Sequence, residues 1–122
     1  AESFNGPSLI LAYSHCIAHG IDIKKGLDQQ YLAVNSGHWP LMRFNPVLRE
    51  ANKNPFLLDS PRPRVPLRDY HKNELRFRML ANTHPDEAER MLQLGQDQVL
   101  RRFAEYEQLA SSDANMFAQG AR

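Results

Sequence analysis

Five prolines lie within residues 46–66, and they exclude a regular helix or a central strand across this stretch. Proline lacks a backbone N–H, and it favours extended geometry in the residue before it. We therefore predict an extended, proline-rich strap over residues 46–66. Because a long structureless connection is uncommon inside a self-contained small domain, we expect the strap to lie across another surface. The strap separates residues 1–45 from residues 67–122.

The first part of the chain predicts two short parallel strands around one helix. Residues 8–13 form a continuous apolar run, which is typical of a strand buried on both faces of a parallel sheet. Residues 41–44 are the second expected strand. A helix is predicted over residues 23–36, with Asp22 as its N-cap and Gly37 at its end. Its predicted apolar stripe consists of Ile23, Leu27, Tyr31 and Val34.

Two helices are predicted in the last part, over residues 67–81 and 85–110, which makes the fold class α/β. In the first, Glu74 and Arg78 have the i,i+4 spacing of an ion pair. In the second, Pro85 suits the first helical position. The apolar residues of the second helix trace one stripe, namely Ala88, Leu92, Gly95, Val99, Phe103, Tyr106 and Ala110. Residues 111–122 lose this pattern and are expected to fray.

Charge and hydropathy exclude several classes of partner. The chain has 15 Lys and Arg residues against 14 Asp and Glu residues, so we expect neither nucleic acid nor a membrane surface as a partner. Its longest apolar run is too short to cross a bilayer, and no signal peptide opens the chain. A single cysteine cannot form an internal disulfide, so we expect a reducing, cytoplasmic location. The chain begins at Ala1 without a methionine, which suggests processing or excision from something larger.

Residues 43–78 carry nine Lys or Arg residues against four acidic residues. This stretch is either a docking patch for an acidic partner or a face that is solvated or paired within the chain. Because charge asymmetry without a motif is a weak guide to partners, we favour the second interpretation.

Cys16 is the residue with the most reactive chemistry, and it follows the predicted strand 8–13. In open α/β sheets, ligands collect at the carboxyl ends of strands. On composition alone, a buried and inert thiol is the favoured interpretation. Two alternatives remain open: nucleophilic catalysis with a histidine base, and a mononuclear metal site formed with His15 and His19. A closed zinc site needs four ligands, and this segment supplies at most three.

Several motifs in one order resemble a stretch near the C-terminus of the pyruvate:ferredoxin (flavodoxin) oxidoreductases. They extend from about residue 6 to residue 110 and are more specific together than any one alone. The motifs are GPSLILAYSHCIAHG at residues 6–20, KGLDQQ at 25–30, LAV at 32–34, SGHWPLMRFNP at 36–46, KNPF at 53–56 and LDS at 58–60.

The resemblance implies a large homodimeric enzyme that uses thiamine diphosphate, Mg²⁺ and [4Fe–4S] clusters. Such enzymes oxidatively decarboxylate pyruvate with coenzyme A to acetyl-CoA and CO₂, and pass electrons singly to ferredoxin or flavodoxin. The implied fold is the C-terminal part of a thiamine-diphosphate-binding domain, which residues 1–45 would end. The strap 46–66 and the helical pair with its tail, residues 67–122, would follow it.

In that family, the cysteine of the Ser-His-Cys stretch is the fourth ligand of the cluster nearest thiamine, and Cys16 matches this position. His15 and His19 could then orient the loop or tune the cluster. The resemblance implies that the other three thiolates, the thiamine anchor, and the coenzyme A and pyruvate sites lie outside this segment. We therefore expect the segment to be inactive alone. The alternatives are a small helical interaction module without chemistry and the mononuclear metal site at His15, Cys16 and His19.

Overall fold

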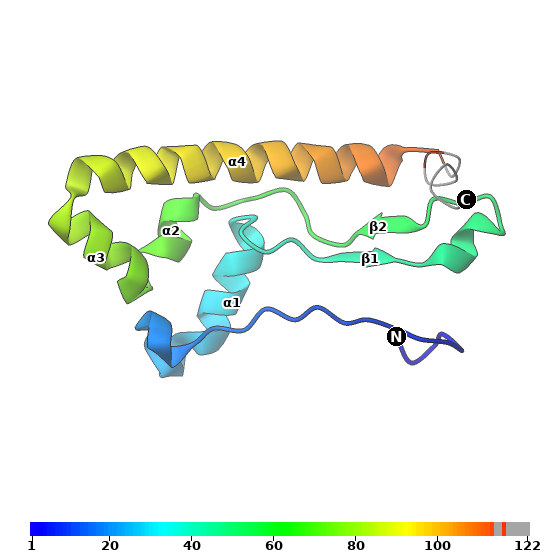
Figure 1. The fold of residues 1–122 in the computed structure, drawn as a ribbon, viewed down its shortest axis with the longest axis horizontal. Helices are drawn as coiled ribbons and strands as arrows, with labels where there is room; N and C mark the ends of the chain where they lie inside the picture. Colours follow the sequence, from blue (N-terminus) through cyan, green and yellow to red (C-terminus); the bar gives the residue numbers. More distant parts are fainter. Residues whose placement is uncertain (114–115, 117–122) are drawn as a thin grey trace.

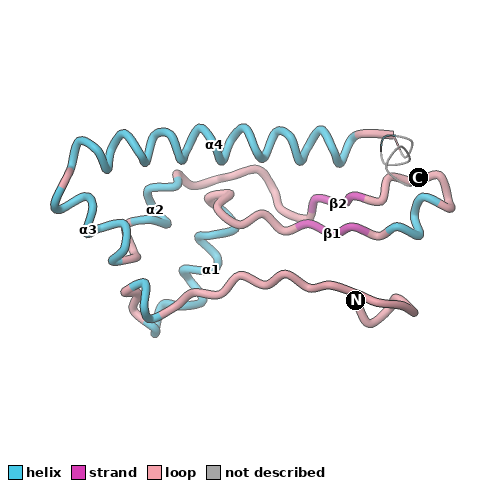
Figure 2. The backbone as a smooth tube through the Cα atoms, in the orientation of Figure 1, coloured by secondary structure: helices cyan, strands magenta, loops and turns pink. Residues whose placement is uncertain are grey.

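The computed structural model describes residues 1–113 and 116. The longest element, α4, lies along one side of the molecule, and the extended N-terminal residues lie along the opposite side (Figure 1). The remaining elements fill the space between them, with the strands toward one end and two short helices toward the other (Figure 2). Their bounds are α1 (Gly26–Asn35), β1 (Met42–Phe44), β2 (Phe56–Leu58), α2 (Leu67–His71), α3 (Leu75–Thr83) and α4 (Pro85–Ser111).

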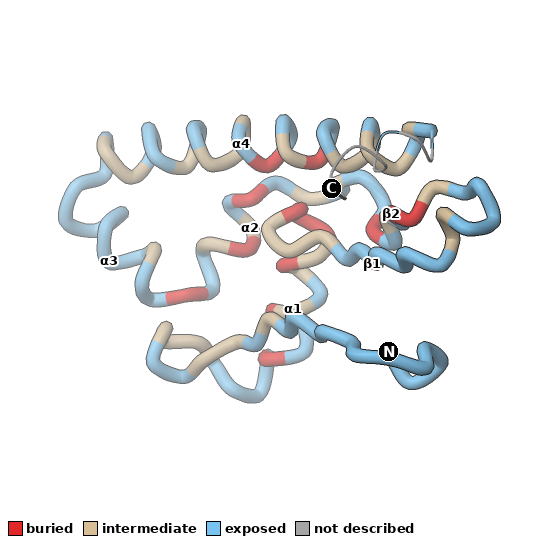
Figure 3. Tube along the Cα trace, turned by 45° about the vertical axis from the view of Figure 1, so that its right-hand side comes forward, coloured by how far each residue is buried: buried red, intermediate tan, exposed pale blue. Residues whose placement is uncertain are grey.

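A small core holds α1, α2 and α4 together. It consists of the buried side chains of Ala33, Leu67, Tyr70 and Val99. Half-buried aromatic and aliphatic side chains surround it, among them Trp39. Figure 3 shows these buried segments where the helices meet, whereas the N-terminal segment is exposed. None of the helices in residues 1–113 has the length and apolar character needed to cross a bilayer.

The prediction for the last helix is confirmed. Pro85 is the first residue of α4, and the helix ends one residue beyond the expected boundary. Val99 and Phe103, in the middle of the predicted stripe, are buried against the rest of the chain. The expectation that residues 111–122 fray falls mainly on residues 114–115 and 117–122, which lie outside the described residues.

The single helix predicted over residues 67–81 is wrong, because the chain forms α2 and α3 with a break between them. Glu74 is extended at this break, with φ −113° and ψ 128°. The next N–H, that of Leu75, donates to the carbonyl oxygen of Gly20 at 3.2 Å instead of to the preceding turn. Glu74 is buried and pairs with Arg76, not with Arg78 as the i,i+4 spacing predicted.

The prediction of two parallel strands is also wrong. Residues 8–13 form no strand in the structure. The strand expected at 41–44 is present as β1, but it pairs antiparallel with β2, in the register Met42 to Leu58 and Phe44 to Phe56. A partner about 14 residues away can close a hairpin-like pair, whereas a parallel pair needs a crossover. The chain is therefore mixed helix and strand, and the thiamine-diphosphate-binding fold remains a prediction.

The proline-rich strap contacts α4 of the same chain. Its Asn54 side chain donates to the carbonyl oxygens of Leu109, Ala110 and Ser112 at 2.7, 3.1 and 2.9 Å, and so satisfies the C-terminal end of that helix. Arg62 forms an ion pair with Glu107. The strap thus covers a surface of its own chain and contributes β2 to the small sheet.

Helix α1 ends one residue before the expected boundary, but it begins three residues later than predicted, and its apolar stripe faces the opposite way. The Asp22 carboxylate accepts from the N–H of Lys24 at 3.0 Å in a 3-10 turn, Ile23–Lys25, that leads into the helix. Gly37 has a left-handed φ of 73° beyond its end. Leu27 and Tyr31 of the predicted stripe are 83% and 71% exposed. The buried face consists of Gly26, Gln29, Ala33 and Asn35.

Candidate functional site at the Cys16 loop

Cys16 lies at the start of a short loop between the extended N-terminal segment and α1. It is the residue before a 3-10 turn, Ile17–His19, and its thiol is free and half-buried. The turn closes through the N–H of His19, which donates to the carbonyl oxygen of Cys16 at 3.0 Å. Ile17 is 72% exposed, so the outer side of the loop is open.

Gly20 ends the loop and fixes it against α3. Its φ is 69°, a left-handed conformation that favours glycine. Its carbonyl oxygen accepts from the N–H of Leu75 at 3.2 Å. A Cβ at Gly20 would lie 2.2 Å from the Cβ of Leu75, so no other residue fits without a shift of the backbone.

The two histidines beside Cys16 face different surroundings. The Nδ1 atom of His15 lies 3.1 Å from the Gln30 side-chain nitrogen on α1, and its ring packs where a Cβ at Gly26 would clash. The Nδ1 atom of His19 is buried and has no hydrogen-bond partner among the described residues. Within residues 1–113 and 116, no three His, Cys, Asp or Glu side chains come together to hold a metal ion. The ligand set of the mononuclear alternative is therefore not assembled.

A buried polar network lies behind the loop, and sequence reasoning missed it. The Tyr13 and Tyr70 hydroxyls are hydrogen-bonded, and Tyr70 is fully buried on α2. The Tyr70 hydroxyl also accepts from Arg76 of α3 at 3.4 Å, and the nearby Glu74 is fully buried. The Glu74 carboxylate accepts from Gln29 of α1 at 3.0 Å and from Arg76 of α3 at 2.5 Å. The carboxylate therefore links α1 to α3, and the N-terminal segment joins this network through the bond between Tyr13 and Tyr70.

The partners of Glu74 set its charge. Burial alone would raise its pKa, but the interactions with Gln29, Tyr70 and Arg76 outweigh burial, and the pKa lies below its ordinary value. Burial, followed by the hydrogen bond with Tyr13 and the neighbouring Glu74 carboxylate, raises the pKa of Tyr70 and keeps its proton in place.

Two further histidines lie in the aromatic layer around Tyr70. The His38 ring stacks on Tyr70 with centroids 4.4 Å apart, and the His71 ring stacks on Phe77 at 3.7 Å. Burial, with a smaller contribution from Arg76, lowers the pKa of His38. Burial and the neighbouring His38 lower the pKa of His71 to about 4. His71 is therefore neutral at pH 7.

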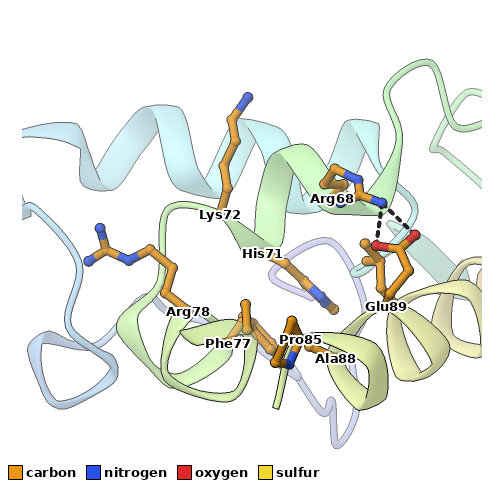
Figure 4. Close-up of a pocket in the computed structure, with 10 residues that line it drawn as sticks. Arg68, His71, Lys72, Phe77, Arg78, Pro85, Ala88 and Glu89 are labelled. Carbon is orange, nitrogen blue, oxygen red and sulfur yellow. Dashed lines mark hydrogen bonds and ion pairs between the residues drawn. The ribbon is translucent and has the colours of Figure 1, made fainter. Parts of the chain in front are cut away.

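His71 and Phe77 also line a hollow of about 340 Å³ between α2, α3 and α4. An ion pair from Arg68 to Glu89 at 2.7 Å closes one side of it, while the side chains of Lys72 and Arg78 extend away from its centre (Figure 4). The hollow thus combines apolar walls with an ion pair that is already satisfied.

At least five of the nine cations in the basic stretch 43–78 form ion pairs within the chain, namely Arg43 with Asp59, Arg62 with Glu107, Arg68 with Glu89, Lys72 with Asp69 and Arg76 with Glu74. For these residues the structure shows the pairing within the chain that the sequence analysis favoured.

Comparison with known proteins places this geometry in context. No family model matches the chain. The pyruvate-flavodoxin oxidoreductases of Nostoc sp. and Rhodospirillum rubrum are 46% and 47% identical to it over 111 residues, which are 91% and 90% of this chain. The pyruvate:ferredoxin oxidoreductase of Moorella thermoacetica is 39% identical over 110 residues, or 90% of the chain.

These matches cover 9% of the length of each of the three relatives. The resemblance that the ordered motifs indicate is confirmed, because proteins of that name match nearly the whole chain. Over about nine-tenths of its length, the chain is thus a homologue of one short segment of the pyruvate-flavodoxin and pyruvate:ferredoxin oxidoreductases.

Proposed function

We propose that this chain is the C-terminal segment of a pyruvate:ferredoxin or pyruvate:flavodoxin oxidoreductase and that Cys16 is a ligand of its thiamine-proximal [4Fe–4S] cluster. The complete enzyme would decarboxylate pyruvate oxidatively with coenzyme A, and pass electrons to ferredoxin or flavodoxin. The observation that carries the proposal is the identity of 46% to a pyruvate-flavodoxin oxidoreductase over 91% of the chain.

The chemistry of the Cys16 loop fits one ligand of a shared cluster. Cysteine thiolates are the usual ligands of [4Fe–4S] clusters, and four are needed. This chain has one cysteine, so the other three thiolates would come from outside it. Cys16 is free, and Ile17 beside it is largely exposed, so a cluster held by other parts of the enzyme could reach the loop from its exposed side. When bound, the cluster would carry single electrons between thiamine and the external acceptor.

The residues of this chain do not by themselves fit thiamine diphosphate or Mg²⁺. Mg²⁺ prefers carboxylate oxygens and substrate phosphates, and no cluster of three acidic or other ligand side chains occurs within the described residues. We infer that both groups are bound elsewhere in a homodimeric, cytoplasmic enzyme. The isolated segment should accordingly reduce no electron acceptor when pyruvate and coenzyme A are supplied.

Exposed apolar residues support the view that other protein covers this chain. Leu9, Ile10 and Leu11 are 84%, 74% and 75% exposed in consecutive positions. Contiguous apolar surface of this kind marks an interaction site in a soluble protein. Another part of the complete enzyme would cover these side chains.

The test is Cys16→Ser in the full-length oxidoreductase that contains this segment. We expect the iron content to fall by about four atoms per chain and the electron paramagnetic resonance signal of one reduced cluster to disappear. Pyruvate-dependent acceptor reduction should fall with them. Ala18→Ser, at an exposed position two residues away, is the matched control and should change none of these. Full iron content and an unchanged spectrum in Cys16→Ser would refute the role of Cys16.

A further inference from the structure

We propose that Tyr13, Tyr70 and Glu74 form a positioning network that holds the Cys16 loop in the conformation in which the Cys16 thiolate coordinates iron. This inference rests on the proposed function of Cys16. None of the three side chains is itself proposed to touch the cluster. They act through the backbone of residues 13–20, which carries the thiol.

The network provides the upstream attachment of the loop. Residues 9–12 are exposed, and Tyr13 is the first half-buried residue along this segment. Its ring stacks on Trp39 with centroids 5.3 Å apart, and its hydroxyl bonds Tyr70. Only Ser14 and His15 lie between Tyr13 and Cys16, so three extended steps of at most about 10 Å separate this attachment from the thiol-bearing residue.

The downstream attachment reaches the same short stretch of the chain. Gly20 is bonded through its carbonyl oxygen to the N–H of Leu75, which directly follows Glu74. Both ends of the loop, residues 13 and 20, are therefore fixed to residues 70–76 at the break between α2 and α3. Residues 70–76, at the break that sequence periodicity did not predict, thus form a clamp that holds both ends of the Cys16 loop.

Glu74 makes this clamp rigid. Its carboxylate is fully buried and accepts from Gln29 of α1 and Arg76 of α3. The same two side chains hold Tyr70, because Gln29 donates to its carbonyl oxygen at 3.1 Å and Arg76 donates to its hydroxyl at 3.4 Å. Asn73 adds a hydrogen bond to the oxygen of Gln29 at 3.1 Å.

The functional consequence concerns the geometry of the iron–sulfur bond. Groups beyond the ligands orient them and tune the potential of an iron–sulfur cluster. A loop tied at one end only would allow the thiolate several orientations. Loss of the Tyr13–Tyr70 bond should therefore change the properties of the cluster without removing a ligand.

The experiment compares Tyr70→Phe and Tyr13→Phe with Tyr31→Phe in the full-length, cluster-loaded oxidoreductase. Each change removes one hydroxyl, and Tyr31 is an exposed ring on α1, outside the network. In both network variants we expect amide hydrogen exchange at residues 14–20 to be roughly five- to tenfold faster, the factor expected for one lost hydrogen bond. We also expect a shifted midpoint potential and altered resonance of one cluster, with iron content retained.

The double variant should resemble Tyr70→Phe, because that change already breaks the bond between the two tyrosines and also removes the acceptor of Arg76. Tyr31→Phe should match the wild-type enzyme in every measurement. Unchanged exchange, potential and resonance in both network variants would overturn the inference. If those measurements are unchanged while Cys16→Ser loses the cluster, only the positioning role fails. If Cys16→Ser keeps the cluster intact, the proposed ligand role fails and the positioning role fails with it.

Discussion

Helix α4 and the N-terminal segment 1–13 each contain a set of apolar side chains, but only that of α4 is packed against the rest of the chain. The stripe of α4 packs on α2, α3 and the strap, and buries Val99 and Phe103. The run Leu9–Leu11 lies on the opposite side of the molecule and remains exposed (Figures 1 and 3). An apolar pattern therefore predicts that a surface becomes buried, but it does not identify the segment that buries it.

Helix α1 shows both behaviours on its two faces. Its Gln29–Ala33 face joins the core, whereas Leu27 and Tyr31 face outward. The N-terminal run is the surface that we propose is covered in the complete enzyme. Four measurements test this difference between the packed and the exposed regions.

The largest effect is expected at the centre of the packed region. Tyr70→Ala should lower the free energy of unfolding by about 3–5 kcal/mol, because it removes a fully buried aromatic ring. Urea denaturation of the chain measures this change. Tyr31→Ala, on the exposed face of α1, is the control and should cost less than about 1 kcal/mol. Equal losses at the two tyrosines would contradict the assignment of the core.

Glu74→Gln should have the next largest effect, a loss of about 2–3 kcal/mol in the free energy of unfolding. The amide keeps the shape of the side chain but removes the charge that Arg76 pairs with and one acceptor of the network. Glu89→Gln breaks the exposed pair with Arg68 and should cost less than about 1 kcal/mol. If both variants unfold at the same urea concentration, Glu74 is not the hub of the packed region.

Acidification should weaken the packed region through His71. Its pKa is about 4 in the folded chain against 6.5 in the unfolded chain, so the unfolded chain binds more protons between these values. Stability is therefore full above pH 6.5 and falls as the pH approaches 4. Because the ring is only partly buried, we expect a loss of about 1–2 kcal/mol. The free energy of unfolding is measured by urea denaturation at pH 7 and at pH 4.5, and His71→Asn should reduce the difference between the two values. An unchanged difference in the variant would contradict the role of His71.

The smallest effect is expected in the uncovered region. Ile10→Ser should change the stability of this chain by no more than about 0.5 kcal/mol, because Ile10 is already 74% exposed. In the full-length oxidoreductase, where we propose that the run 8–13 is covered, the same substitution should cost about 2 kcal/mol. A large loss in the isolated chain would show that this segment packs on the chain itself.

The bounds of α4 and the C-terminal end of α1 could be predicted from local chemistry. Pro85 at the first helical position and Gly37 beyond a helix end act through neighbouring residues and are found as predicted, whereas Asp22 caps the 3-10 turn before α1 and not the helix itself. The ordered motifs around Cys16 could also be matched to a family. These features need no knowledge of distant parts of the chain.

The break at Glu74, the pairing of β1 with β2 and the direction in which α1 faces could not be predicted in this way. All three depend on residues far apart in the sequence. The break depends on Gly20 and Gln29, and the pairing of β1 depends on Phe56–Leu58. The buried face of α1 depends on its contacts with α2. Periodicity records that a residue is apolar or charged, but burial and hydrogen bonding depend on what folding brings beside it. The local structure of the chain is thus determined by neighbouring residues, whereas the network behind Cys16 forms only when folding brings α1, α2 and α3 together around Glu74 and Tyr13 beside Tyr70.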